Sequence, residues 1–441
     1  MEIYRFSPIQ QKRFVSVFTK PQPIKTLPQG IDILKSILAT TVKSTDTRNI
    51  WQLGIRHCVN GKTIKNNEKY GPTFAPTISP ESLIFQLAYS AAFDFQLQTG
   101  DCFNAIQCTY KPDPTKRIWC YLPPYYIQWW NSTYKHDPID PTNGPFAMQA
   151  AQNIQGTPHA GNRWKRNLDA HLTKHGYTCN NVDKAFYTYH QDGELNAMLS
   201  TTVDDFLQSF KTLLIRDQFF QFMGEAFDVT TPGLQKELSF LSLRIYQSQH
   251  VISVDQTQHI YKNILSEWSP TSMAFLALDY LMSYLHHHLH ESIFYPKKPI
   301  SPDELVTYTW LRQQQTTYTT KSTCIYHIDA AFANILPDQR SMQSSIGFLN
   351  GVAISWSCNI QSTIAVDSID AETKAFFYVS KKACALKNFL SSTNLHPVIN
   401  TPPHIYADNC ATIGLIKTNK LTFRSRHLEI PVAFTHDRYT L

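Results

Sequence analysis

The chain has 441 residues, a length that allows two or three domains. Apolar residues make up 42% of it and charged residues only 17%, which argues against a long disordered chain. The net charge of +6 at pH 7 is compatible with a phosphate-rich partner but does not require one. None of the nine cysteines forms a C-x-x-C pair, so neither a zinc ribbon nor a thioredoxin-type dithiol is expected.

The sequence begins without a charged and then apolar leader, and its odd number of cysteines favours reduced thiols. We therefore expect an intracellular protein, cytoplasmic or nuclear, that is not secreted. The most apolar stretch, 273–285, is short and contains Asp279. Because a membrane span needs about 18 or more apolar residues, we expect no transmembrane segment and no membrane partner.

Residues 1–30 are weakly periodic and contain several prolines, which predicts an irregular lead-in, and we assign 1–44 to it. Strand-like and helix-like runs alternate from about residue 31 to 268, and we place the first domain over 45–268. Seven prolines within 110–145 indicate a loop-rich stretch. The other elements expected in this region are helices at 81–93 and 162–175, a strand entering a turn over 94–105, and strands at 195–203, 206–210, 243–246 and 251–254.

The segment 313–323 is polar and lacks an apolar face, so we place a domain boundary there. An α/β pattern follows it. Two strands flank Asn350-Gly351, a strong hairpin signal. The elements expected are strands at 323–330, 346–349, 352–356 and 404–407, and a helix over 371–390.

Two groups of acidic residues stand out, five of them at the ends of expected strands and Glu372 in the first turn of an expected helix. The first group is Asp101, Asp204 and Asp205, and the second is Asp329, Glu372 and Asp408. Carboxylates that converge in this way can hold magnesium together with substrate phosphate oxygens. Taken singly, each has a commoner explanation, such as a solvated Asp-Asp turn or an acid at a helix N-terminus.

Basic and histidine-rich runs are less specific. The first run comprises Arg163, Lys165, Arg166 and Lys174, and it suits either a template backbone or a solvated helix face. The histidines at 286–288 and 290 favour the C-terminal end of an amphipathic helix over a metal site.

Several motifs in the first part resemble the reverse transcriptase of copia-type retrotransposon polyproteins. YGPTFAP (70–76) is similar to the family's ETFAP segment, and GDCFNAIQ (100–107) resembles LDVKTAF. IQGT (154–157), followed by Trp164 and Leu168, is similar to a template-side motif. Thr202-Val203-Asp204-Asp205 stands where the family has YVDD.

The second part resembles the RNase H of the same family. IDAAFA (328–333), ISWS (354–357), DAE (370–372) and ADN (407–409) occur in the family's order, and SRHLEIPVAF (425–434) is similar to its TKHIDVRYHF. The resemblance covers about 45–441. This ordered set of motifs favours a functional role for the six acids over their commoner explanations.

The resemblance implies a mixed α+β and α/β fold: a palm-and-fingers reverse transcriptase domain followed by an RNase H-like domain. It implies that both groups of acids are catalytic metal ligands for Mg²⁺ or Mn²⁺. Arg56 would contact the incoming triphosphate, as an Arg fork suits phosphate oxygens. The other substrate-binding positions would be Ile106, Gln155 and Gly156. The implied partners are an RNA template, a DNA primer, the RNA–DNA hybrid and dNTPs.

The sequence also departs from the family pattern. Thr202 replaces the Tyr before VDD, and Ile106 replaces a Phe that normally lies under the incoming sugar. We expect a shortened connection and linker over 269–322, and an RNase H-like domain over 323–441 that stops before the family's distal acid. Three readings stay open: an active enzyme, a catalytically inactive nucleic-acid-binding remnant, and a structural or interaction protein.

Overall fold

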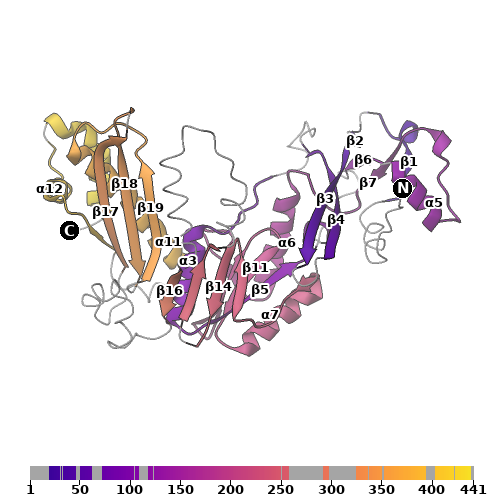
Figure 1. Cartoon of the computed structure of the whole chain (residues 1–441), viewed down its shortest axis with the longest axis horizontal. Helices are drawn as coiled ribbons and strands as arrows, with labels where there is room; N and C mark the ends of the chain where they lie inside the picture. The colour runs from indigo at the N-terminus through magenta and orange to yellow at the C-terminus, as the bar shows by residue number, and fades with distance from the viewer. Residues whose placement is uncertain are drawn as a thin grey trace.

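The computed structural model describes residues 19–29, 31, 33–45, 50–61, 72–103, 105–108, 118–122, 124–249, 251–257, 292–296, 324–335, 337–349, 352–393, 403–421 and 423–438. These residues form five β-sheets and the helices that cover them. The predicted mixture of helices and sheets is confirmed. The N-terminal sheets lie at one end of the molecule and the C-terminal sheet at the other (Figure 1).

A small four-stranded sheet has the order β1-β7-β6-β2, with β1 at Gln22–Pro23, β7 at Phe146–Gln149, β6 at Trp119–Tyr121 and β2 at Ile33–Leu34. Next to it in the chain, β3 (Ser36–Thr45) and β4 (Ile50–Val59) form an antiparallel hairpin. The predicted irregular lead-in over 1–44 is therefore wrong for the described residues from Gln22 onward, because β1 and β2 gain their order by pairing with strands more than 80 residues away. Residues 1–18 lie outside the description.

The loop-rich stretch predicted over 110–145 contains a helix, α5 (Pro124–Thr133). Proline is compatible with the first position of a helix, because that position needs no N–H for an intrahelical bond. Trp130 and Tyr126 of α5 are buried in the core of the N-terminal sheet. The prediction of loops was wrong for this segment.

A six-stranded antiparallel sheet forms the centre of the molecule, in the order β12-β5-β11-β10-β9-β8. Its strands span Val229–Thr230 (β12), Gln96–Cys102 (β5), Asp205–Phe210 (β11), Glu194–Thr201 (β10), Phe186–Gln191 (β9) and Tyr177–Cys179 (β8). Side chains alternate between its faces: Met198 and Leu207 belong to one core, and Leu199 and Phe206 to another. Helix α3 (Pro80–Ala92) contributes to the first core. Helices α6 (Ala160–Lys174) and α7 (Leu213–Ala226) contribute to the second.

A second antiparallel sheet follows, in the order β13-β14-β15-β16. Its strands span Glu237–Phe240 (β13), Leu243–Gln247 (β14), Val251–Asp255 (β15) and Ile293–Pro296 (β16). Tyr295 of β16 is fully buried and joins the α3 core. Most of the predicted connection and linker, including the apolar stretch 273–285 and the histidine run, lies outside the described residues.

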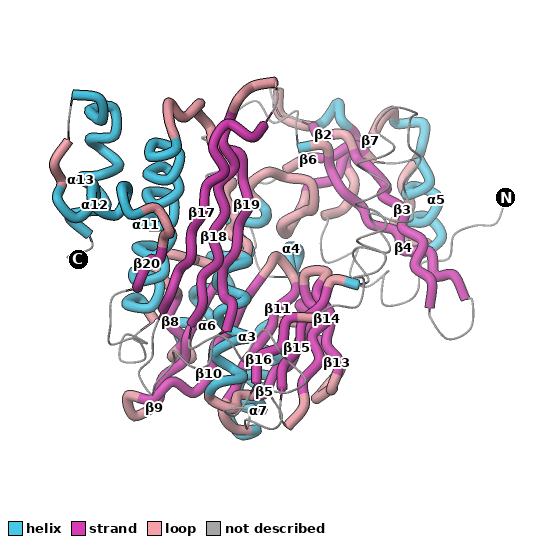
Figure 2. Tube along the Cα trace, turned by 60° about the vertical axis from the view of Figure 1, so that its left-hand side comes forward, coloured by secondary structure: helices cyan, strands magenta, loops and turns pink. Residues whose placement is uncertain are grey.

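The C-terminal sheet has the order β19-β18-β17-β20, and only the β17–β20 pair is parallel. Its strands span Val352–Ile360 (β19), Arg340–Leu349 (β18), Cys324–Ile335 (β17) and His404–Tyr406 (β20). Leu349 pairs with Val352, as the hairpin signal predicts, although the two turn residues lie outside the description. Helix α11 (Ser368–Ser392) lies along the sheet (Figure 2), and α12 (Cys410–Thr418) and α13 (Glu429–Arg438) follow β20 in the chain.

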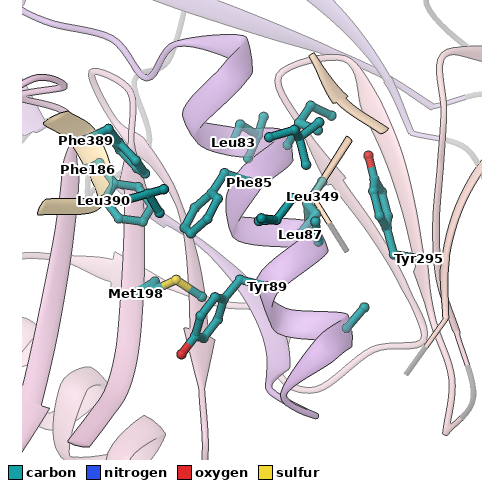
Figure 3. Close-up of a cluster of buried hydrophobic side chains, with 14 of the residues drawn as sticks. Leu83, Phe85, Leu87, Tyr89, Phe186, Met198, Tyr295, Leu349, Phe389 and Leu390 are labelled. Atoms are coloured by element: carbon teal, nitrogen blue, oxygen red, sulfur yellow. The ribbon is translucent and has the colours of Figure 1, made fainter. Parts of the chain in front are cut away.

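The central and C-terminal parts share one hydrophobic core around α3. The Phe389 ring of α11 packs against Phe85 and Phe186, with ring centroids 5.3 and 5.0 Å apart (Figure 3). The buried Asn180 side chain donates a hydrogen bond to the Phe389 carbonyl at 3.2 Å. The two parts are thus packed against each other at α3, a contact that the sequence analysis did not predict.

Candidate active sites

The first group of acids lies at one end of the central sheet. Asp101 of β5 stands directly opposite Asp205 of β11 in the antiparallel register, so both side chains leave the same face. Asp204 occupies the turn between β10 and β11, where the sequence predicts a hairpin. The Thr202 amide donates to the Asp205 carbonyl, and the Cys102 amide donates to the Asp204 carbonyl, each at 2.8 Å. These backbone bonds fix the turn against β5.

The charges of these acids interact. Partial burial and the charges of Asp204 and Asp101 raise the pKa of Asp205 above its ordinary value. Within the described part of the chain, however, the carboxylate oxygens of this group do not meet closely enough to form a three-ligand cluster, whereas those of the second group do. The structure therefore brings the three residues to one sheet end without closing a metal site.

Two of the departures from the family pattern lie near this end. Ile106 is half-buried in the short helix α4 (Ala105–Cys108), directly after β5. Thr202 is half-exposed, and its hydroxyl donates to the Asp205 carbonyl at 3.3 Å. Neither side chain supplies the aromatic ring found in the family.

Gln155 and Gly156 lie in a loop that contacts the end of β4. The Val59 amide donates to the Gln155 carbonyl at 2.9 Å, and the Cys58 thiol lies 3.7 Å from Gln155 Oε1. Gly156 has φ +94°, and a Cβ there would lie 2.0 Å from the Val59 carbonyl oxygen. Only glycine fits this contact. Arg56 lies three residues earlier on β4, but its side chain is outside the description.

The second group of acids forms a compact cluster. Asp329 lies on β17, Glu372 in the first turns of α11, and Asp408 just after β20. One ligand oxygen from each residue lies within 4.8 Å of the other two. Three elements far apart in the sequence thus bring carboxylates together, as the motifs predict.

Glu372 gives the clearest sign that this cluster suits a cation. It is 6% exposed, and its Oε1 accepts a hydrogen bond from the Ala330 amide at 3.2 Å. Its other oxygen, Oε2, is buried and accepts no hydrogen bond from the described residues. Burial, with the charges of Asp408 and Asp329, raises the pKa of Glu372 to about 7. A hard divalent ion with oxygen ligands would satisfy this set of donors.

The basic run on α6 does not act as a unit. Lys165 is buried, and its ammonium pairs with Asp169 and donates to the Tyr187 hydroxyl at 2.7 Å. Arg163 donates to Asn153 Oδ1 at 3.2 Å. Arg166 is exposed. A role of Lys165 in holding a template backbone is therefore excluded, while Arg166 is free to serve in it.

The sequence analysis missed a buried polar cluster beneath the β10–β11 hairpin. Gln86, on the buried side of α3, contacts Ser200 and Ser209. The signal available in the sequence was a glutamine within the apolar positions of the predicted helix 81–93.

No family model matches the chain. In sequence, the chain is 27% identical over 104 residues to the "Retrovirus-related Pol polyprotein from transposon TNT 1-94" of Nicotiana tabacum; the aligned part is 24% of this chain and 8% of that polyprotein. This match agrees with the motifs, and the resemblance to a retroelement Pol polyprotein is confirmed.

The chain also aligns with two solved structures, each at a TM-score below 0.5. One is the foamy viral protease-reverse transcriptase dRH in complex with double-stranded DNA, with a TM-score of 0.49, 12% identity, and coverage of 92% of this chain and 63% of that one. The other is the foamy viral protease-reverse transcriptase in complex with RNA/DNA hybrid, with a TM-score of 0.45, 12% identity, and coverage of 93% and 50%. The chain spans less than two thirds of either structure.

The mixed α+β and α/β class expected from the resemblance agrees with the observed order of sheets and helices. Among the helices that the structure describes, none is both long and apolar enough to cross a membrane.

Proposed function

We propose that the chain is the reverse transcriptase and RNase H region of a copia-type retrotransposon. It copies an RNA template from a DNA primer with dNTPs, and it cleaves the RNA strand of the RNA–DNA hybrid. The observation that carries this proposal is the cluster of Asp329, Glu372 and Asp408, whose oxygens meet within 4.8 Å in the strand, helix and strand order of the RNase H motifs.

The polymerase part of the proposal is supported by the central sheet. Asp101 and Asp205 are cross-strand partners, and Asp204 lies in the turn beside them. Arg56 would contact the triphosphate, and Ile106, Gln155 and Gly156 would line the substrate site. Gly156 supports this assignment because it holds the loop against the end of the strand that carries Arg56.

Both sites would use Mg²⁺ or Mn²⁺, which when bound lowers the pKa of an attacking hydroxyl or water and neutralises charge on the reacting phosphate. The carboxylates of the protein would hold the metal ions in place. Asp329, Glu372 and Asp408 would be the ligands in the C-terminal site, and Asp101, Asp204 and Asp205 those in the central site.

Primer extension on an RNA template with Mg²⁺ tests the polymerase part, with Asp204→Asn as the inactive variant. Cleavage of the RNA strand in a labelled hybrid tests the C-terminal part, with Glu372→Gln as the inactive variant. Each variant serves as the control for the other site, because their acids lie on different sheets. Extension by Asp204→Asn at the parent's rate would exclude the central assignment, and unchanged cleavage by Glu372→Gln would exclude the C-terminal one.

A nucleic-acid-binding remnant without polymerase turnover is the second candidate. It is favoured by the looser arrangement of Asp101, Asp204 and Asp205, which form no three-ligand cluster among the described residues. Salt-sensitive binding of primer–template without extension would support this candidate. Extension would reject it.

A further inference from the structure

A group of polar side chains lies buried between α3 and the central sheet. Gln86, Ser90, Ser200 and Ser209 each have no measurable exposure. They lie among apolar residues of the α3 core, such as Met198 and Leu207. Polar groups at such depth are costly unless they bond to one another, so their arrangement must be specific.

The Gln86 carboxamide contacts both strands of the hairpin that ends in Asp204-Asp205. On β10, the Ser200 hydroxyl donates to Gln86 Oε1. On β11, Gln86 Nε2 donates to Ser209 Oγ at 2.8 Å and to the Leu207 carbonyl at 3.1 Å. Nε2 also lies 3.4 Å from the Met198 carbonyl of β10. One carboxamide therefore bonds to both strands of the hairpin.

These contacts depend on the register of the two strands. Ser200 is paired with Leu207, and Met198 with Ser209. Ser200 lies four residues before Asp204, and Leu207 two residues after Asp205, so the contacts sit next to the turn. A slip of one strand by one residue would turn its serine, Ser200 or Ser209, to the opposite face, and a slip of two would move that serine by about 7 Å. Either slip would leave the buried amide without its partner on that strand.

An apolar side chain at this position would not favour one register over another, because the cores on both faces of the sheet are apolar and would accept it equally well. We propose that Gln86 is a positioning residue that fixes the β10–β11 register and so holds Asp205 opposite Asp101 and Asp204 in the turn beside them. Gln86 touches no reacting atom and acts through the hairpin. The catalytic consequence rests on the polymerase function proposed above, whereas the positioning itself does not.

The first test uses Gln86→Met, which keeps the length of the side chain and removes its hydrogen bonds. Hydrogen exchange is followed at the amides of Thr202 and Cys102, which bond to the Asp205 and Asp204 carbonyls. We expect faster exchange at these two amides, with β8 and β9 as protected as in the parent. Unchanged exchange at both amides would overturn the proposal. This readout needs no activity.

The second test measures the Mg²⁺ concentration that gives half-maximal primer extension. We expect Gln86→Met to raise it by about 10- to 100-fold, the range found when groups that orient metal ligands are removed. Cleavage of hybrid RNA by the C-terminal site should keep the parent's Mg²⁺ dependence. Ser90→Ala is the matched control, because Ser90 bonds to Ser209 and to its own helix but not to β10.

A purely structural role is distinguished by Leu83→Ala, a variant of a buried residue on the same helix that makes none of these hydrogen bonds. The two variants are compared at temperatures where each has lost the same fraction of folded protein. An equal rise in Mg²⁺ requirement in both would overturn the proposal. If the parent itself extends no primer while Gln86→Met speeds exchange at the turn, the polymerase function fails and the positioning role stands.

Discussion

The surroundings of the buried Glu372 carboxyl link its protonation to the stability of the fold. Its neighbours are two other acids, and one of its oxygens is buried without a hydrogen bond from the described residues. The pKa of about 7 means that the folded chain holds a proton on this group over a pH range where an unfolded chain, with an ordinary pKa of 4.5, has released it. Without a cation, folding is therefore linked to protonation.

We predict that the metal-free protein loses stability as pH rises from about 4.5 to about 7, because the folded state has the raised pKa. Thermal unfolding at pH 5 and pH 7.5 in EDTA measures the loss. In Glu372→Gln this contribution should disappear, and Mg²⁺ should reduce it in the parent by replacing the proton. A parent whose pH dependence equals that of Glu372→Gln would contradict the prediction.

Gly156 allows a second prediction at the same scale. A side chain there would meet the Val59 carbonyl at 2.0 Å as well as adopt φ +94°. Gly156→Ala should cost more than the roughly 1–3 kcal/mol of a strained backbone alone. If the proposed polymerase function holds, Gly156→Ala should also raise KM for dNTPs, because the loop would push the end of β4 away from its position.

Gly144→Ala is the matched control. Gly144 has the same φ of +94°, but a Cβ there has no atom within 4 Å. Urea unfolding and dNTP titration of the two variants separate the strain from the contact. Equal losses of stability and equal changes in KM in the two variants would show that the contact with β4 contributes nothing beyond the backbone strain.

The candidate residues were predictable where an ordered motif carried them. Five of the six acids lie at or just after a strand end, at a turn or in the first turns of a helix, as predicted. Asp329 instead lies in the middle of β17, because that strand continues to Ile335, beyond its expected end at residue 330. Lys165 was not predictable. Its position on α6 differs from that of the exposed Arg166 by one residue, and only the packing of Tyr187 against the helix reveals which is buried.

Among the elements, those with a long periodic pattern were predicted well. The helix predicted at 81–93 is α3 (Pro80–Ala92), and the hairpin around Asp204-Asp205 is β10 and β11. Strands β1 and β2 have two residues each, which is too short for any period to appear. Their existence depends on pairing with β7 and β6, which local sequence does not encode.

The contact between α3 and α11 yields a prediction for these elements. Phe389 is 4% exposed and packs on Phe85 and Phe186. Phe389→Ala should lower the free energy of unfolding by about 3–5 kcal/mol, as for other buried aromatic residues. Hydrogen exchange should then quicken in α3 as well as in α11.

Phe377→Ala provides the comparison on the same helix. Phe377 is half-buried and contacts Phe434 of α13. Phe377→Ala should quicken hydrogen exchange in α13 and leave hydrogen exchange in α3 unchanged. If α3 responds to both variants alike, the aromatic contact is not what couples the two helices.

At the scale of the whole molecule, the shared core and the net charge matter most. The shared core could not be predicted, because it joins side chains hundreds of residues apart through α3. The net charge of +6 follows directly from the sequence, but the sequence does not show which basic residues are exposed to a partner. The buried Lys165 and the exposed Arg166 show that the net charge of the chain differs from the charge available to bind a partner.

We predict that the chain binds a primer–template duplex with an affinity that falls with salt, because counterions are released from the phosphates. Arg166→Ala should reduce the slope of log affinity against log salt by about 1. Lys165→Met should leave it unchanged, because that ammonium is already paired with Asp169. Filter binding between low and physiological ionic strength makes the measurement, and a salt-independent parent would refute the prediction.

The ring contacts of Phe389 also bear on how the chain is made. About 300 residues separate Phe85 from Phe389, so at roughly 5–20 residues per second the ribosome takes about 15–60 s to supply the second ring after the first. Throughout that interval the surface of α3 that Phe389 covers in the finished protein lacks this partner on the nascent chain. Phe85 and Phe186 stay without this ring contact during that time, and the core that the N-terminal half begins is completed only when the C-terminal helix emerges.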